Sequence, residues 1–166
     1  CSMTLLYPEG TAVQVLERTE QTEATVQEIM NGQEQHEKTI LIVEDDEDLG
    51  ALILEALQQE SFYTGIHYRT LLAIDGKEAL EIIEETFPDL FLLDYYLPRI
   101  NGLDLYDRIH AIETLSQVPT IFMSANPPFK ELRKRNLLSI RKPFNLRELL
   151  DTIEKALVTH KKEELE

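Results

Sequence analysis

Hydrophobic and polar positions alternate regularly along the chain from Thr39 onward. Five short apolar runs predict strands at residues 40–43, 68–74, 90–94, 120–124 and 138–141. Between these runs, apolar residues recur at the three- and four-residue spacing of helices. Strands that alternate with helices in this way predict an α/β domain with a parallel sheet, right-handed crossovers and helices on both faces.

The run at residues 90–94 is the centre of this pattern. Four bulky residues before Asp94 indicate a strand that is buried on both faces. Asp94 then lies at the carboxyl end of the strand, the edge at which open α/β sheets bind ligands. A strand-terminating aspartate without further function is the plain alternative, and for an isolated aspartate it is the more common case.

Local signals place the ends of the helices. The helix after the first strand has its predicted inward stripe at Leu49, Leu52, Ile53, Ala56 and Leu57. Asp46 suits the cap of this helix, and residues 61–67 are interpreted as a small surface insertion before the second strand. Asn145, with Glu148 three residues later, predicts the start of the final helix.

Residues 1–38 do not share the alternation. Apolar residues within 11–30 form a stripe that polar residues interrupt, which predicts a partial helix followed by a polar linker. Both a solvated leader and a docked partner element stay open for this segment. The predicted organisation is an N-terminal extension at 1–38, partly helical, a domain at 39–160 and a charged tail at 161–166.

Composition and charge narrow the classes of function. The 166 residues include 16 basic and 31 acidic side chains, a net charge of −15, which argues against nucleic acid and anionic membranes as partners. The single cysteine, Cys1, rules out an internal disulfide and fits a reducing compartment. No apolar run is long enough to span a bilayer and no secretory leader precedes the body, so we expect a soluble, cytoplasmic protein.

Residues that could take part in catalysis or binding lie together at one predicted edge of the sheet. They are Glu44, Asp45, Asp94, Ser124 and Lys142, and each ends or follows a predicted strand. Crowded carboxylates repel, and a hard divalent cation such as Mg²⁺ relieves that repulsion. Lys142 would supply positive charge and Ser124 a hydroxyl for phosphoryl oxygens, while Asp94 would be the nucleophile that forms an aspartyl phosphate.

Each of these residues, considered alone, could instead have a purely structural role. Residues 44–46 could only cap a helix, Ser124 could end a strand, and Lys142 could be a solvated lysine before a turn. Taken together, these residues favour a functional site, because the periodicity of the predicted elements and the spacing of the motifs agree with one another. Hydrolase chemistry has no support, since the four histidines lack metal-ligand spacing and no serine or cysteine nucleophile has an adjacent base motif.

Short motifs stand in a fixed order at these strand ends. They are Leu41-Ile42-Val43-Glu44-Asp45-Asp46, Pro88-Asp89-Leu90, Leu97-Pro98 with Gly102, Ser124-Ala125 and Lys142-Pro143-Phe144. With these motifs, residues 40–157 resemble the receiver domain of two-component response regulators. The resemblance implies the flavodoxin-like (βα)5 fold, a doubly wound parallel sheet of strand order 2-1-3-4-5.

The resemblance also implies the chemistry of the acidic residues. Asp94 would accept a phosphoryl group from a phosphohistidine of a sensor histidine kinase or a histidine phosphotransfer protein. Mg²⁺ would be bound by Asp45, Asp94 and the Tyr96 carbonyl, and Glu44 would hold a metal-bound water. Such a domain is a phosphoacceptor rather than an enzyme, with autophosphorylation and autodephosphorylation as its only chemistry.

Three further roles follow from the same resemblance. Ser124 would be the switch hydroxyl, Lys142 would contact the phosphoryl group, and Ala125 would join the cofactor-binding residues. The Lys142–Pro143 peptide is usually cis in this family, which places the ammonium over the site.

Two departures from the family pattern concern the output of the domain. Residues 126–136 are several residues shorter than the usual fourth helix and its loops, and Pro127-Pro128 stands at their start, so the helix must be short or distorted. Three residues before Lys142, where many receivers have tyrosine or phenylalanine, this chain has Ser139. The usual aromatic switch is therefore missing.

The favoured hypothesis is a receiver that signals through contacts with a downstream protein, with a homodimer left open. One alternative is a receiver-like interaction module that is not phosphorylated. Another is a receiver excised from a hybrid kinase or a multidomain regulator. Intact Asp45, Asp94, Ser124 and Lys142 favour phosphorylation.

Overall fold

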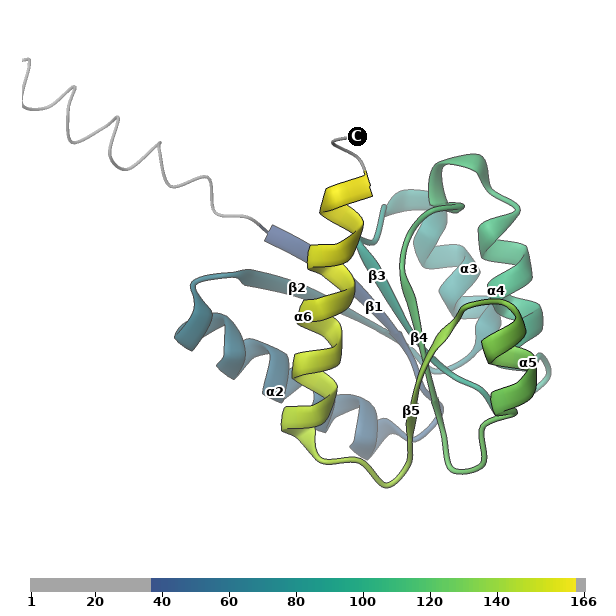
Figure 1. Cartoon of the computed structure of the whole chain (residues 1–166), viewed down its shortest axis with the longest axis horizontal. Coiled ribbons are helices and arrows are strands. Elements are labelled where there is room, and N and C mark those ends of the chain that lie inside the picture. Colours follow the sequence, from purple (N-terminus) through teal and green to yellow (C-terminus); the bar gives the residue numbers. More distant parts are fainter. Residues whose placement is uncertain (1–36, 164–166) are drawn as a thin grey trace, which may run out of the picture. The chain divides into compact units, whose positions relative to one another are not determined.

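The computed structural model describes residues 37–163 of the chain, with side chains described for residues 37–158. Five parallel strands form one sheet in the order β2-β1-β3-β4-β5 (Figure 1). The strands are β1 (Glu37–Val43), β2 (His67–Ala73), β3 (Leu90–Asp94), β4 (Thr120–Ser124) and β5 (Leu138–Arg141). The predicted fold class and strand order are confirmed.

Helices cover both faces of this sheet. They are α2 (Glu47–Thr64), α3 (Gly76–Glu85), α4 (Gly102–His110), α5 (Phe129–Lys134) and α6 (Leu146–Glu163), with the short 3₁₀ helix η1 (Glu113–Leu115) after α4. Figure 1 shows α2 and α6 on one side of the sheet and α3, α4 and α5 on the other. Each side has its own cluster of buried side chains.

The central strand β3 belongs to both clusters, as the apolar run before Asp94 predicts. All five of its residues are buried. Phe91 and Leu93 pack in the cluster under α3, α4 and α5, and Leu90 and Leu92 pack in the cluster under α2 and α6. This alternation follows from the two-residue period of a strand, and it fixes Asp94 at the end of a rigid element.

Two predicted helix caps are confirmed. The Asp46 Oδ1 accepts hydrogen bonds from the backbone N–H groups of Asp48 and Leu49, both at 3.1 Å. The Asn145 Oδ1 accepts a hydrogen bond from the backbone N–H of Glu148 at 3.0 Å. Both side chains satisfy N–H groups that the first helical turn leaves unpaired.

Residues 61–67, interpreted as a small surface insertion, form the end of α2, the turn after it and the first residue of β2, and Phe62 and Tyr63 are exposed there. Helix α2 continues to Thr64 and ends at Gly65, whose φ of 73° is the left-handed conformation that glycine adopts at helix ends. The Ser61 Oγ donates to the Leu57 carbonyl and accepts from the backbone N–H of Tyr68, both at 3.0 Å. These bonds connect the helix end directly to β2.

The predicted inward stripe of α2 is wrong at one position. Leu52 is 46% exposed, whereas Gly50, Ile53 and Leu57 are buried. A Cβ at residue 50 would lie 2.8 Å from the Leu72 side chain, so the helix approaches β2 closely there. That close approach sets the rotation of α2 and turns Leu52 outward.

The structure differs from the prediction at the start of the first strand. Strand β1 begins at Glu37, two residues before the predicted start of the domain, because residues 37–39 already pair with β2. The predicted helix within 11–30 lies outside the described residues. Within residues 37–163, no helix is both long enough and apolar enough to cross a lipid bilayer.

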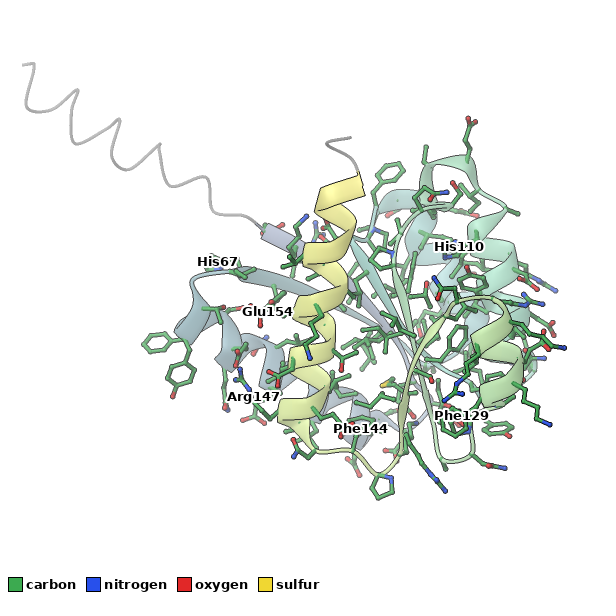
Figure 2. The ribbon with its side chains drawn as sticks, viewed as in Figure 1. His67, His110, Phe129, Phe144, Arg147 and Glu154 are labelled. Carbon is green, nitrogen blue, oxygen red and sulfur yellow. The ribbon has the colours of Figure 1, made fainter. Side chains whose placement is uncertain are left out.

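His110 is a half-buried histidine at the end of α4 (Figure 2). Its Nδ1 lies 2.9 Å from the Ser116 carbonyl oxygen and its Nε2 lies 3.2 Å from the Thr120 Oγ1. The ring stacks on Tyr106, with 3.9 Å between centroids. Burial lowers the pKa of the imidazole, although the Ser116 carbonyl and Asp107 oppose that shift.

The lowered pKa of His110 predicts a loss of stability in acid. The folded state prefers neutral imidazole, so this contribution is complete above the unfolded pKa and is lost as pH falls below it. Between pH 7.5 and 5.5, the free energy of unfolding should fall more steeply for the wild type than for His110→Gln. Urea unfolding at each pH measures both slopes, and parallel slopes would contradict the assignment.

Candidate functional site

The strand register brings the predicted site residues to one edge of the sheet. Asp94 pairs in register with Met123, so Ser124 follows on the neighbouring strand at the same level. Ser124 pairs in turn with Arg141, and the Lys142 backbone N–H donates to the Ser124 carbonyl at 2.8 Å. The predicted gathering of polar residues at the carboxyl edge is thereby present in the fold.

Lys142 lies between two buried carboxylates. Its Nζ is 2.7 Å from the Glu44 Oε2 and 2.6 Å from the Asp94 Oδ2. Glu44 is 1% exposed and Asp94 is 6% exposed. The Lys142–Pro143 peptide is cis, as expected. The solvated-lysine interpretation of Lys142 is therefore wrong, because its ammonium joins the ends of β1 and β3.

Three carboxylates form a cluster at this position. One oxygen each from Glu44, Asp45 and Asp94 lies within 4.8 Å of the others. Asp45 is exposed to solvent, whereas the other two carboxylates are buried. The cluster consequently has one accessible side, and its all-oxygen donor set is the kind that Mg²⁺ and Ca²⁺ prefer.

Burial and the neighbouring charges shift the pKa values of Glu44 and Lys142. Desolvation raises the pKa of Glu44 to about 7, and the nearby Asp94 adds to this effect while Lys142 opposes it. Burial lowers the pKa of the Lys142 ammonium, but its hydrogen bonds to Asp94 and Glu44 outweigh burial and raise it. Lys142 stays charged at neutral pH, and Glu44 is poised to exchange a proton there.

The backbone after Asp94 is held close to its carboxylate. The Tyr96 N–H donates to the Asp94 Oδ1 at 2.9 Å, and the Gly102 N–H donates to the Tyr95 carbonyl at 2.8 Å. A Cβ at Gly102 would lie closer than 3.0 Å to the Asp94 carbonyl oxygen. Only glycine fits this approach, which gives a physical reason for the glycine four residues after Pro98.

The Tyr96 side chain extends across the rim of the site. Its hydroxyl donates to the Asn126 carbonyl at 3.4 Å, and its ring makes an edge contact with Tyr95, with 5.0 Å between centroids. The residue is 58% exposed. The Asn126 contact joins the loops after β3 and β4.

Ser124 is fully buried, and its Oγ accepts a hydrogen bond from the Asn126 N–H at 3.2 Å. Ala125 follows it and is exposed. Helix α5 has six residues and begins after Pro128, which confirms the predicted short helix. In β5, Ser139 is partly buried and provides no aromatic ring.

Comparisons with known proteins relate this chain to signalling domains. The sequence profile of the response regulator receiver domain matches residues 40–154. The transcriptional regulatory protein CpxR of Escherichia coli is 34% identical over 120 residues, which are 69% of this chain and 47% of that protein. Sporulation initiation phosphotransferase F of Bacillus subtilis is 30% identical over 122 residues, or 71% of this chain and 92% of that protein.

Solved structures show the same architecture. A receiver domain protein (CheY-like) from Methanospirillum hungatei superposes with a TM-score of 0.67 at 28% identity, covering 76% of this chain and 98% of that one. A putative response regulator from Chloroflexus aurantiacus has a TM-score of 0.61 at 27% identity, with 73% and 98% covered. The chain spans about half the length of the CpxR proteins that it matches.

Proposed function

Because the chain belongs to the response regulator receiver domain family, we propose that Asp94 accepts a phosphoryl group from a phosphohistidine of a sensor histidine kinase or a histidine phosphotransfer protein. The observation that supports this most directly is the Lys142 ammonium, which lies 2.6 Å from the Asp94 carboxylate. A buried carboxylate beside a fixed cation, at the carboxyl edge of a parallel sheet, is a suitable acceptor for an anionic group.

In the proposed step, a carboxylate oxygen of Asp94 attacks phosphorus. A P–O bond forms while the P–N bond of the phosphohistidine breaks, and the electron pair leaves on the imidazole nitrogen. Lys142 and the Ser124 hydroxyl would contact the phosphoryl oxygens. Alanine offers only backbone donors, so Ala125 would contribute its N–H.

The acidic cluster fits a divalent cation. Asp45 and Asp94 would bind Mg²⁺ directly together with the Tyr96 carbonyl, and Glu44 would hold a metal-bound water. When bound, Mg²⁺ neutralises carboxylate and phosphoryl charge. Burial raises the pKa of Glu44 to about 7, so a proton on Glu44 and a bound cation would compete.

We further propose that the signal leaves through protein contacts. A net charge of −15 disfavours nucleic acid, and the similarity to a sporulation phosphotransferase supports phosphoryl transfer between proteins. A homodimer is left open, and the division at 1–38, 39–160 and 161–166 stays a proposal whose boundaries shift to include all of β1 and α6 in the domain.

Phosphoryl acceptance by the full chain tests the function. Incubation with acetyl phosphate and Mg²⁺ should raise the intact mass by one phosphoryl group, and hydroxylamine should remove it, as expected for an acyl phosphate. An excess of EDTA should suppress the gain. An unchanged mass under all conditions, with the chain folded, would favour an interaction module that is not phosphorylated.

Tyr96 should prolong the life of the phosphorylated state. Its ring bridges the loops after β3 and β4 through the Asn126 contact and should limit the approach of water to an acyl phosphate on Asp94. Tyr96→Ala should therefore lose the phosphoryl group several-fold faster than the wild type. Tyr63→Ala is the matched control, since Tyr63 is an exposed tyrosine on α2. Equal decay in all three proteins would remove the ring from the explanation.

The conformational response should concentrate in residues 124–136. Helix α5 is short and has Leu132 as its one fully packed residue, whereas β5 lacks an aromatic ring that could change burial. Beryllofluoride, an aspartyl-phosphate mimic, should cause large amide shifts in 124–136 and small ones in 138–141. Large shifts throughout 138–141, abolished by Ser124→Ala, would show that β5 switches without an aromatic residue.

A further inference from the structure

The loop between β3 and α4 carries the Tyr96 carbonyl, one of the proposed metal ligands. The start of this loop is fixed by the bond from the Tyr96 N–H to Asp94, and its end by the bond from the Gly102 N–H to Tyr95. Leu97 is buried in the cluster under α3, α4 and α5, and the Ile100 N–H donates to the Pro98 carbonyl at 2.8 Å, which leaves residues 98–100 as the tip of the loop. The position of the tip depends on contacts with another element.

Arg99, at the tip, contacts Asp75 at the start of α3. The Arg99 guanidinium forms an ion pair with the Asp75 Oδ2. The other oxygen, Oδ1, accepts from the backbone N–H groups of Lys77 and Glu78 at 2.8 and 2.9 Å. Asp75 is 7% exposed, so its carboxylate is a buried, charged anchor that α3 itself holds in place.

Two more features tie the tip to the same helix start. Arg99 has a φ of 68°, a left-handed conformation that is uncommon for a residue with a side chain. The next residue, Ile100, packs on Gly76 so closely that a Cβ there would come within 3.0 Å of the Ile100 Cγ2. Adjacent loop residues thus contact the N-cap and the first residue of α3, and both contacts restrain the tip of the loop.

We propose that Arg99 and Asp75 form a positioning pair that holds the β3–α4 loop, and with it the Tyr96 carbonyl that is proposed as a metal ligand. This inference rests on the proposed function, because it requires a cation at that cluster. Mg²⁺ demands near-ideal octahedral geometry, so a displaced carbonyl weakens its binding. Residues that orient metal ligands typically contribute 10- to 100-fold in affinity.

The direction in which Arg99→Ala changes the affinity for Mg²⁺ distinguishes a positioning role from electrostatic repulsion of the cation. Removing a cation near an acidic cluster should tighten the binding of Mg²⁺ if charge alone acts. Loss of positioning should weaken it, by about tenfold. Lys77→Ala is the control for charge, because it removes an equal positive charge two residues after Asp75, from an exposed side chain that pairs with Glu81, while leaving the backbone N–H bond and the Arg99 contact intact.

Asp75→Asn tests whether the two residues act together. Asparagine keeps a carbonyl oxygen for the Lys77 and Glu78 N–H groups but loses the charge that pairs with Arg99. If the pair acts as a unit, Arg99→Ala in the Asp75→Asn background should weaken Mg²⁺ binding no further. Arg99→Lys should restore part of the affinity, since it keeps the charge without the planar fork.

Calorimetric titration of Mg²⁺ into the full-length chain measures these affinities, and urea unfolding without Mg²⁺ measures stability. We expect a Kd about tenfold higher in Arg99→Ala and Asp75→Asn, and an unchanged or lower Kd in Lys77→Ala. If the wild type binds Mg²⁺ and Arg99→Ala binds as tightly or more tightly, the positioning pair is overturned whatever its effect on stability, and the proposed function stands. If the wild type does not bind Mg²⁺, both are overturned.

Discussion

Asp94→Asn should gain no phosphoryl group from a phosphodonor that phosphorylates the wild-type chain. An amide oxygen carries no negative charge and is a poor nucleophile, so the P–O bond does not form. The variant should still fold, because asparagine has nearly the same volume and retains an oxygen that accepts the Tyr96 N–H bond. Lys142 keeps Glu44 as its partner in the variant.

Intact mass after incubation with acetyl phosphate and Mg²⁺ measures this loss. Asp104→Asn is the matched control, since it makes the same change at an exposed aspartate in the first turn of α4. The control should gain one phosphoryl group as the wild type does. A gain in Asp94→Asn equal to that of the control would place the acceptor elsewhere.

Asp45→Asn should slow phosphorylation by about 100-fold at a fixed, limiting concentration of Mg²⁺. Asp45 is the exposed member of the carboxylate cluster, and a neutral amide in its place weakens the hold on a divalent cation. A loss of about 3 kcal/mol in transition-state stabilisation, the scale of a metal's contribution, corresponds to about this factor in rate. A large excess of Mg²⁺ should restore part of the rate.

Asp45→Asn should also reduce the stabilisation of the folded state by Mg²⁺. For the wild type, Mg²⁺ at about ten times its Kd should add about 1.4 kcal/mol to the free energy of unfolding, which raises the thermal midpoint by a few degrees. Asp45→Asn should show little of this rise at the same concentration. Asp48→Asn, an equal charge change at an exposed position in the first turn of α2, should respond as the wild type does. Identical rises in all three proteins would exclude Asp45 from metal binding.

Much of the fold was predictable because local signals and the global arrangement agree. The apolar run before Asp94 has the length and hydrophobicity of a strand buried on both faces, and β3 is such a strand. The caps at Asp46 and Asn145 depend only on neighbouring backbone N–H groups, so their spacing in the sequence was sufficient.

The error in the inward stripe of α2 has a tertiary origin. Its inward face depends on how closely Gly50 approaches Leu72 of β2, which no periodicity in the helix itself reveals. Its length depends on the Ser61 side chain, which bonds Tyr68 in β2, although Gly65 did carry a readable helix-stop signal.

The candidate site was likewise predictable only in part. The set of Glu44, Asp94 and Lys142 was predictable, because parallel strands end at one edge and motif spacing marked those ends. The contact between Arg99 and Asp75 was not, because it joins two loops whose relative position only the folded sheet determines.

Chemical identification of the modified residue tests the central claim most directly. The chain, phosphorylated with acetyl phosphate and Mg²⁺, is reduced with sodium borohydride, which converts an acyl phosphate to the alcohol and thereby turns aspartyl phosphate into homoserine. Mass spectrometry of peptides then locates the homoserine. We predict homoserine at position 94, absent without the phosphodonor. Homoserine at Asp45 or at another aspartate, with Asp94 unmodified, would contradict the assignment of Asp94 as the phosphoacceptor.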